Sequence, residues 1–205
     1  MIAVIDYGVG NLFSLCSSLK YIGADSIVTS DKNEITRADK IILPGVGAFA
    51  DAKAKLDALG LASLIRTLAA EGKEIMGICL GMQLLFERSY EFGECEGLGL
   101  LTGSIVPIRN YVDSSLKVPH IGWNALNKTK ESKLLRYVNA GECVYFVHSY
   151  FADGCEDSVV ATAEYGHALT AAVERGNIMG CQFHPEKSGE VGMKILRAFC
   201  EEDRA

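Results

Sequence analysis

Residues 74–89 read EIMGICLGMQLLFERS, a stretch in which an apolar, strand-like run becomes helix-like at Cys79. Gly77 and Gly81 flank this cysteine in the spacing Gly-x-Cys-x-Gly, which matches the Gly-x-Ser-x-Gly nucleophile elbow. An elbow needs these glycines because a sharp turn from strand to helix leaves little room for a Cβ atom. A thiol at the first turn of a helix is also favoured as thiolate. The pattern predicts either a nucleophile or a small cysteine buried in a tight junction, a common position for free cysteine.

The sequence before this stretch alternates between short strands and helical patterns. IAVIDYG (2–8), SIVTS (26–30) and KIILPGVGAF (40–49) are strand-like, and apolar residues recur at helical spacing over residues 12–22 and 56–68. Such alternation predicts a parallel sheet. Reactive groups collect beyond the carboxyl ends of the strands in such a sheet, and Cys79 follows one of these ends.

Six shorter strand candidates with turn signals between them follow the elbow. They cover residues 99–109, 118–128, 142–150, 158–166, 169–176 and 177–186. We expect them to form a mixed, partly antiparallel region added to the parallel core, before a last helix after Ser188. The prediction is a three-layer α/β fold, with a mostly parallel central sheet, helices on both faces, and one domain over residues 1–205.

Composition excludes several classes of protein. The net charge of −6 argues against a general nucleic-acid binder, which would show a basic stripe. The N-terminal residues lack a basic segment, so we expect no signal peptide, and no apolar run approaches the ~18 residues of a membrane span. The seven cysteines are odd in number and form no CxxC pair, which makes a disulfide framework improbable. We therefore expect a cytoplasmic protein with reduced thiols.

A cysteine nucleophile needs a base, and the base needs an orienting acid. Of the four histidines, only His184 follows a strand directly and has an acid two residues away, in His184-Pro185-Glu186. We expect an extended backbone, fixed by Pro185, to place both side chains on one face. His148 also ends an apolar strand but has no local carboxylate. His120 has no acid near it, and His167 lies in a predicted hairpin tip.

Two other kinds of site are poor interpretations of these residues. Cys181 and His184 have a C-x-x-H spacing, but on a strand they point to opposite faces and no second pair of ligands exists. The YGVGN stretch at 7–11 is not GxGxxG and lacks the acid of a dinucleotide site. We therefore expect neither a metal ion nor an organic cofactor.

Acyl chemistry on cysteine also needs backbone N–H groups directed at the developing negative charge. The amide of Leu80, directly after Cys79, is one natural donor. The loop Pro44-Gly45-Val46-Gly47 ends a neighbouring strand, and its glycines let the backbone approach a ligand. We therefore expect Val46 and Gly47 to complete this oxyanion site, although alone the loop could be an ordinary turn. Gln83 lies one turn after Cys79 and either holds a polar substrate or faces solvent.

Together, GICLGMQ, PGVGAF and QFHPEKS resemble the class I, or triad-type, glutamine amidotransferases, and the likeness runs from Asp6 to Ser188. DYGVGNL, PHIGWN and VHSYF resemble one branch in particular. In that branch a glutaminase subunit passes ammonia to a separate cyclase subunit, a (β/α)₈ barrel, which makes imidazole glycerol phosphate and an aminoimidazole carboxamide ribotide in histidine biosynthesis. The resemblance implies a heterodimer that hydrolyses L-glutamine to glutamate and ammonia.

The resemblance also implies roles for individual residues. Cys79 would attack the glutamine amide carbon, His184 would move the protons and Glu186 would hold the imidazole. The oxyanion and substrate residues would be Leu80, Val46, Gly47, Gln83, His148, Ser149 and Tyr150. The partner interface would include Trp123, Asn124 and Lys187. Composition alone favours a buried core position for Trp123, because tryptophan is mostly buried. The resemblance instead predicts a partly exposed side chain that becomes an anchor when the partner subunit binds.

Three alternatives share parts of this pattern. A cysteine peptidase or a reactive-cysteine stress protein would have the elbow without needing Gln83 or the Pro-Gly-Val-Gly loop. A non-catalytic regulatory subunit would keep its function after Cys79→Ser. A paralogous glutaminase would supply ammonia to a different synthase, for instance in surface-sugar synthesis.

Overall fold

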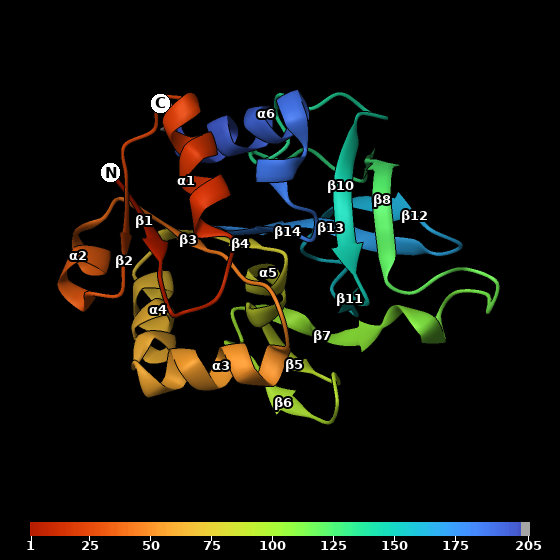
Figure 1. Ribbon diagram of the computed structural model, residues 1–205, viewed down its shortest axis with the longest axis horizontal. Coiled ribbons are helices and arrows are strands. Elements are labelled where there is room, and N and C mark those ends of the chain that lie inside the picture. Colours follow the sequence, from red (N-terminus) through yellow and green to blue (C-terminus); the bar gives the residue numbers. More distant parts are fainter. Residues whose placement is uncertain (202–205) are drawn as a thin grey trace.

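The computed structural model describes residues 1–201, and an eight-stranded sheet runs through the middle of them (Figure 1). Its strand order is β2-β1-β3-β4-β14-β13-β12-β9. The first five strands in this order pair in parallel, and the last three continue the sheet antiparallel. The strands are β1 (Ile2–Ile5), β2 (Ser26–Thr29), β3 (Lys40–Leu43), β4 (Glu74–Ile78), β9 (Asn127–Lys128), β12 (Val159–Glu164), β13 (Ala168–Arg175) and β14 (Ile178–Cys181).

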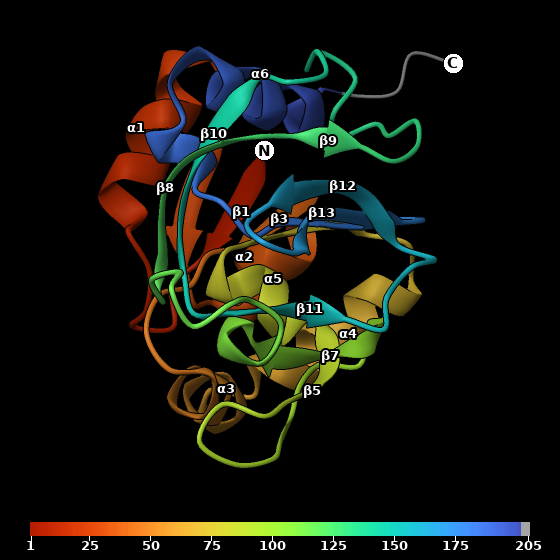
Figure 2. The ribbon, with the colours of Figure 1, turned by 90° about the vertical axis from the view of Figure 1, so that its right-hand side faces the viewer.

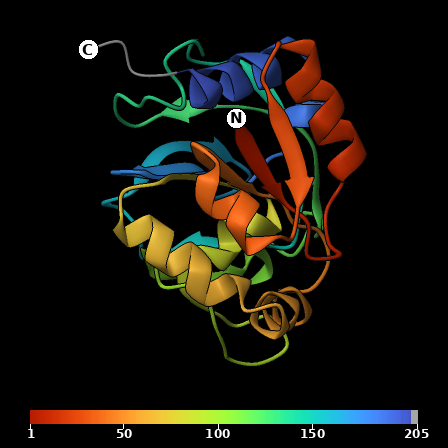
Figure 3. The ribbon, with the colours of Figure 1, turned by 90° about the vertical axis from the view of Figure 1, so that its left-hand side faces the viewer.

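Helices cover both faces of this sheet, as Figures 2 and 3 show from the two sides. α1 and α6 pack on one face, and α2, α3, α4 and α5 pack on the other. The strand β1 shows the reason, because its residues are apolar on both faces of the sheet. Ile2 and Val4 pack in the core beneath α1 and α6, and Ala3 and Ile5 pack in the core beneath α2 to α5. The helices are α1 (Leu12–Tyr21), α2 (Lys32–Arg37), α3 (Phe49–Ala58), α4 (Leu61–Ala70), α5 (Leu80–Leu84) and α6 (Gly189–Cys200). The predicted three-layer α/β fold is confirmed.

The added strands are divided among three places. β9, β12 and β13 extend the central sheet, β8 and β10 form a separate antiparallel ribbon, and β7 and β11 join β5 and β6 in a four-stranded sheet. The sequence predicts one mixed region instead of three, and α2, β5 and β6 are not predicted from it. The bounds are β5 (Phe86–Ser89), β6 (Cys95–Glu96), β7 (Leu101–Pro107), β8 (His120–Ala125), β10 (Cys143–His148) and β11 (Tyr150–Asp153), with short 3₁₀ turns η1 (Ile108–Asn110) and η2 (Pro185–Lys187).

Within residues 1–201, no helix is long and apolar enough to cross a bilayer. The longest, α6, has 12 residues, against the roughly 20 that a membrane span requires. The prediction of a single domain covers residues 1–205, which extends past the described residues, and it stays a prediction.

Candidate active site

Cys79 lies in a strained turn between β4 and α5, at the carboxyl edge of the sheet. Its backbone has φ 54° and ψ −113°, and Phe92 is the only other described non-glycine residue with positive φ. The Cys79 amide donates to the Cys181 carbonyl at 2.8 Å, which ties the turn to β14. A positive φ costs free energy in a non-glycine residue and is often found where function demands it. The predicted elbow geometry is present.

The two flanking glycines are required by close packing. A Cβ atom on Gly77 would lie 2.5 Å from the Met82 Cα, and one on Gly81 would lie 1.8 Å from the Leu43 carbonyl oxygen. Both neighbours are backbone atoms, which cannot move aside without shifting α5 or β3. The spacing Gly-x-Cys-x-Gly therefore holds the first turn of α5 against the end of β3.

His184 and Glu186 follow β14, the strand next to β4. The His184 Nδ1 atom lies 2.8 Å from the Glu186 Oε1 atom, and both side chains are 3% exposed. Both His184 and Cys79 line the same cavity, and Cys79 acts on the pKa of the imidazole. Burial opposes the charged imidazolium, but the contacts with Cys79 and Glu186 outweigh it and raise the pKa of His184 to about 9. The arrangement joins a thiol, an imidazole and a carboxylate in series.

The predicted reason for the His184–Glu186 contact is wrong. Pro185 does not extend the chain but begins the 3₁₀ turn η2, where its fixed φ suits the first position. The Ser188 hydroxyl donates to the His184 carbonyl at 2.6 Å, and the His184 amide donates to the Tyr145 carbonyl at 3.0 Å. The turn, rather than an extended strand, brings the carboxylate back to the imidazole.

A cavity of about 510 Å³ opens in front of Cys79 and His184. This size suits a small-molecule ligand. It is lined by most of the predicted residues: Val46, Gly47, Cys79, Leu80, Gln83, His148, Ser149, Tyr150, His184 and Lys187. Glu91, Phe92, Pro119 and Val147 complete the wall and were not predicted. Glu186 lies behind His184, and Trp123 and Asn124 are not part of the lining.

The predicted oxyanion loop packs against the elbow. A Cβ atom on Gly45 would lie 2.7 Å from the Gly81 nitrogen and 2.9 Å from the Leu80 Cβ, so the loop backbone lies directly against α5. Gly47 has φ 94°, a conformation that glycine adopts without strain. Val46, Gly47 and Leu80 therefore contribute to one wall of the cavity.

Gln182 is a buried neighbour of Cys79 that is not among the predicted site residues. Its Nε2 atom donates to the Cys79 Sγ atom at 3.7 Å, and its Oε1 atom accepts from the Gln83 Nε2 atom at 2.9 Å. Gln83 Nε2 also donates to the Tyr150 carbonyl at 3.2 Å. The available signal was position, since Gln182 lies two residues before His184 at the end of β14, and alternate residues of an extended chain share a face.

His148 faces the cavity as part of a buried histidine pair. Its Nε2 atom lies 3.0 Å from the His120 Nδ1 atom, and its Nδ1 atom lies 2.9 Å from the Tyr150 carbonyl oxygen. The His120 Nε2 atom lies 2.9 Å from the Asn124 Oδ1 atom, because the Asn124 Nδ2 atom donates to the Glu164 carbonyl. Burial lowers the pKa of His148 to about 3 and also lowers the pKa of His120.

The predicted interface residues lie in different environments. Trp123 on β8 is 56% exposed and Ile121, two residues earlier on the same strand, is 59% exposed. Lys187 lines the cavity. The Asn124 amide is bonded within the chain, to His120 and to Glu164. An interface role for these three predicted residues stays a prediction.

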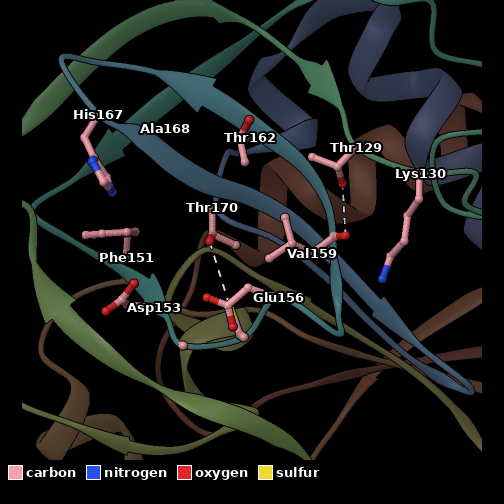
Figure 4. Close-up of a pocket in the computed structure, with 12 residues that line it drawn as sticks. Thr129, Lys130, Phe151, Asp153, Glu156, Val159, Thr162, His167, Ala168 and Thr170 are labelled. Carbon is pink, nitrogen blue, oxygen red and sulfur yellow. Dashed lines mark hydrogen bonds between the residues drawn. The ribbon is translucent and has the colours of Figure 1, made fainter.

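His167 does not line this cavity and lies in the turn between β12 and β13, as the sequence predicts. Its ring contacts Tyr111 and lines a second hollow of about 440 Å³ (Figure 4). Phe151, Asp153 and Thr170 line the same hollow. Across residues 1–201, no group of three His, Cys, Asp or Glu side chains is placed to hold a metal ion.

Comparisons with known proteins show the family of the chain. Residues 3–202 match the family described as glutamine amidotransferase class-I. The imidazole glycerol phosphate synthase subunit HisH of Bacillus cereus is 51% identical over 199 residues, covering 97% of this chain and 93% of that protein. The HisH subunit of Lactococcus lactis is 48% identical over 202 residues, covering 98% of both chains.

Solved structures show the same fold at low sequence identity. A crystal structure of a glutamine amidotransferase superposes with a TM-score of 0.76 at 17% identity, covering 97% of both chains. The glutaminase domain of a Trypanosoma brucei CTPS with bound acivicin superposes with a TM-score of 0.67 at 16% identity, covering 100% of this chain and 95% of that one. The elbow, the matched sequence and the fold lead to one conclusion: the chain belongs to the class I glutamine amidotransferase family.

Proposed function

We propose that this chain is the glutaminase subunit of an imidazole glycerol phosphate synthase, with Cys79, His184 and Glu186 as its catalytic triad. The observation that carries the proposal is the series Cys79–His184–Glu186 at the elbow, inside a cavity that fits a small molecule. Full-length likeness to HisH subunits, near 50% identity, supports the choice of subunit.

In the proposed reaction the Cys79 sulfur attacks the side-chain amide carbon of glutamine. The carbon–nitrogen bond breaks, the nitrogen takes a proton from His184, and ammonia leaves a thioester behind. Water then attacks the thioester and gives a proton to His184, and the carbon–sulfur bond breaks to release glutamate. Amides of the Leu80 and Val46–Gly47 wall would stabilise the oxyanion in both halves.

The raised pKa of His184 suits the first half of this sequence. With a pKa of about 9, the imidazole is protonated near neutral pH, so the proton for the leaving ammonia is present before the attack. Glu186 is held at 2.8 Å from Nδ1 and stabilises this charge. Because the Nδ1 atom of His184 contacts Glu186, the Nε2 atom is the one available to the sulfur and the substrate.

Labelling with a glutamine-analogue diazo-ketone tests the proposed nucleophile. We expect modification of Cys79 alone, together with loss of ammonia release from glutamine, and no ammonia release from Cys79→Ser. Cys143→Ser is the matched control, because Cys143 is the exposed cysteine of the described chain and would react first if exposure alone decided. Labelling of another cysteine with Cys79 untouched would overturn the proposal.

The proposed partner is a (β/α)₈ cyclase subunit that receives the ammonia, docked over β8 and the cavity mouth. Trp123 is the only tryptophan of the chain, so its fluorescence reports this one surface. Titration with a tryptophan-free cyclase subunit should shift the emission and raise glutamine hydrolysis over the same concentration range. An unchanged spectrum while hydrolysis rises would place the interface elsewhere. A paralogous acceptor synthase would be revealed by co-purification from the native cell.

A further inference from the structure

Two glutamine side chains connect the nucleophile to the backbone of β11. Gln182 is fully buried and Gln83 is 6% exposed, and neither carries a charge. In order, the contacts are Cys79 Sγ to Gln182 Nε2 at 3.7 Å, Gln182 Oε1 to Gln83 Nε2 at 2.9 Å, and Gln83 Nε2 to the Tyr150 carbonyl at 3.2 Å. The triad as proposed uses none of these amide groups.

The direction of this chain of hydrogen bonds is fixed by its last member. The Tyr150 carbonyl can only accept, so Gln83 must present its NH₂ group to it. The second hydrogen of that NH₂ group goes to Gln182, which must then present its oxygen to Gln83. Gln182 is left with its NH₂ group on the sulfur. Turning either amide over would place two acceptors or two donors face to face.

We propose that Gln182 is a positioning residue of the glutaminase reaction, which donates an N–H to the Cys79 sulfur and fixes the amide of Gln83. This inference rests on the proposed function, because it needs Cys79 as the nucleophile. A hydrogen-bond donor at the sulfur stabilises the thiolate, which is the form that attacks and later leaves. Hydrogen bonds to charged groups are stronger than hydrogen bonds to neutral groups.

The same chain determines what Gln83 offers to the cavity. Both hydrogens of its NH₂ group are used, and its Oε1 atom accepts no hydrogen bond from the described residues. Gln83 lines the cavity, so this oxygen is an acceptor for the substrate. A carboxamide N–H or an α-ammonium group of glutamine would match it, whereas a carboxylate would be repelled.

The test measures how the reactivity of Cys79 depends on pH in Gln182→Glu and Gln182→Met. Both replacements have nearly the size of glutamine, and neither donates an N–H to the sulfur. The second-order rate of Cys79 modification by iodoacetamide is followed by peptide mass spectrometry at several pH values. We expect the rate on the acidic side of this profile to fall by roughly tenfold in both variants, because the attacking sulfur loses a hydrogen-bond donor. The kcat/KM for glutamine should fall by about tenfold or more.

Thr170→Val is the matched control. The Thr170 hydroxyl lies 3.8 Å from the thiol of another buried cysteine, Cys155, on the wall of the second hollow (Figure 4). Its removal deletes a comparable contact between a polar group and sulfur away from the elbow. We expect the pH profile of Cys79 and the glutaminase activity to stay at wild-type values, while thermal unfolding of all three variants reports any general loss of stability.

The outcomes separate this inference from the proposed function. A Cys79 pH profile that is unchanged in both Gln182 variants would overturn the role of Gln182, even if their activity fell, because a purely structural role would not move the profile. A wild-type chain in which the diazo-ketone leaves Cys79 unlabelled would overturn the proposed function itself. Shifted profiles in both Gln182 variants, with Thr170→Val unchanged, would establish the inference.

Discussion

His184 and His148 line the same cavity and are both buried, at 3% and 6% exposure, yet their imidazoles differ strongly in proton affinity. The pKa of His184 is raised to about 9 and that of His148 is lowered to about 3. Burial disfavours the charged form of both. His184 has a carboxylate and a thiol as partners, whereas His148 has a carbonyl and another imidazole.

The difference teaches that the partner, more than the degree of burial, decides which imidazole holds a proton at neutral pH. It also explains why an acid two residues from His184 is an informative sequence feature, although the chain reaches that contact through a turn. His184 is therefore suited to give a proton to a leaving group, and His148 is suited to remain neutral.

The most direct test of this comparison replaces each of the two histidines by asparagine in turn and compares the loss of activity. His184→Asn should reduce glutamine hydrolysis by ~10²–10⁴-fold or more, because it removes the acid–base group. His148→Asn should cost much less, because that imidazole is neutral and its Nδ1 is engaged by a carbonyl. Steady-state ammonia release measures both. An inactive His148→Asn beside an active His184→Asn would reverse the assignment.

Glu186→Gln sharpens the comparison, because it removes the carboxylate charge beside His184 and leaves the partners of His148 unchanged. We expect a loss of activity that is about one to two orders of magnitude smaller than the loss in His184→Asn. The reason is that the carboxylate orients the imidazole and transfers no proton. The pKa of His184, followed by NMR of the labelled imidazole, should fall toward its ordinary value. An unchanged NMR titration would show that the thiol, and not the carboxylate, accounts for the raised pKa.

The same variant has a consequence for stability. A folded-state pKa raised to about 9 means that charged His184 stabilises the fold below about pH 6.5, and that this contribution is lost as pH rises toward 9. The Glu186→Gln protein should lose part of this dependence. Denaturant unfolding at several pH values measures the difference between the two proteins.

The last expected effect concerns His148 in acid. Its folded-state pKa of about 3 lies below the unfolded value near 6.5, so the unfolded chain binds more protons between these values. The free energy of unfolding should therefore decrease as pH falls from about 6.5 toward 3, by at most ~1.4 kcal/mol per pH unit for this one group. His148→Asn should show a shallower decrease. Parallel curves for both proteins would contradict the lowered pKa.

Much of the fold can be predicted from the sequence because the parallel strands carry continuous apolar runs and the elbow carries two glycines. The parts that cannot be predicted are short or depend on distant contacts. The helix α2 has six residues, too few for a clear periodicity, although Asp31 caps it by accepting from the Asn33 and Glu34 amides. The strand β5 begins two residues after α5 ends, within one uninterrupted apolar stretch.

The candidate site divides in the same way. Cys79, His184 and Glu186 occur in short motifs, so their neighbours in sequence identify them. Gln182 contacts Cys79 across 103 residues and Gln83 across 99. The pairing of β8 with β10 places His120 opposite His148. The spacing from His184 predicts the face on which Gln182 lies, but the contacts themselves depend on which strands are adjacent.

The histidine pair has a further consequence, which follows from counting hydrogens. Two neutral imidazoles carry two N–H hydrogens, but the pair makes three contacts: with Tyr150, between the two rings, and with Asn124. The oxygens at both ends can only accept. Two hydrogens can therefore satisfy any two of the three contacts, and a third hydrogen would satisfy all of them only by charging the pair, which burial opposes.

The unsatisfied contact can move along the pair by tautomer exchange while every heavy atom stays in place. In one arrangement the Tyr150 carbonyl accepts from His148, and in another it does not. The same carbonyl accepts from Gln83, whose amide direction it fixes. The Tyr150 carbonyl, which ends the hydrogen-bonded series Cys79–Gln182–Gln83, is therefore shared with a histidine pair that has one arrangement of heavy atoms and several possible positions for its hydrogens.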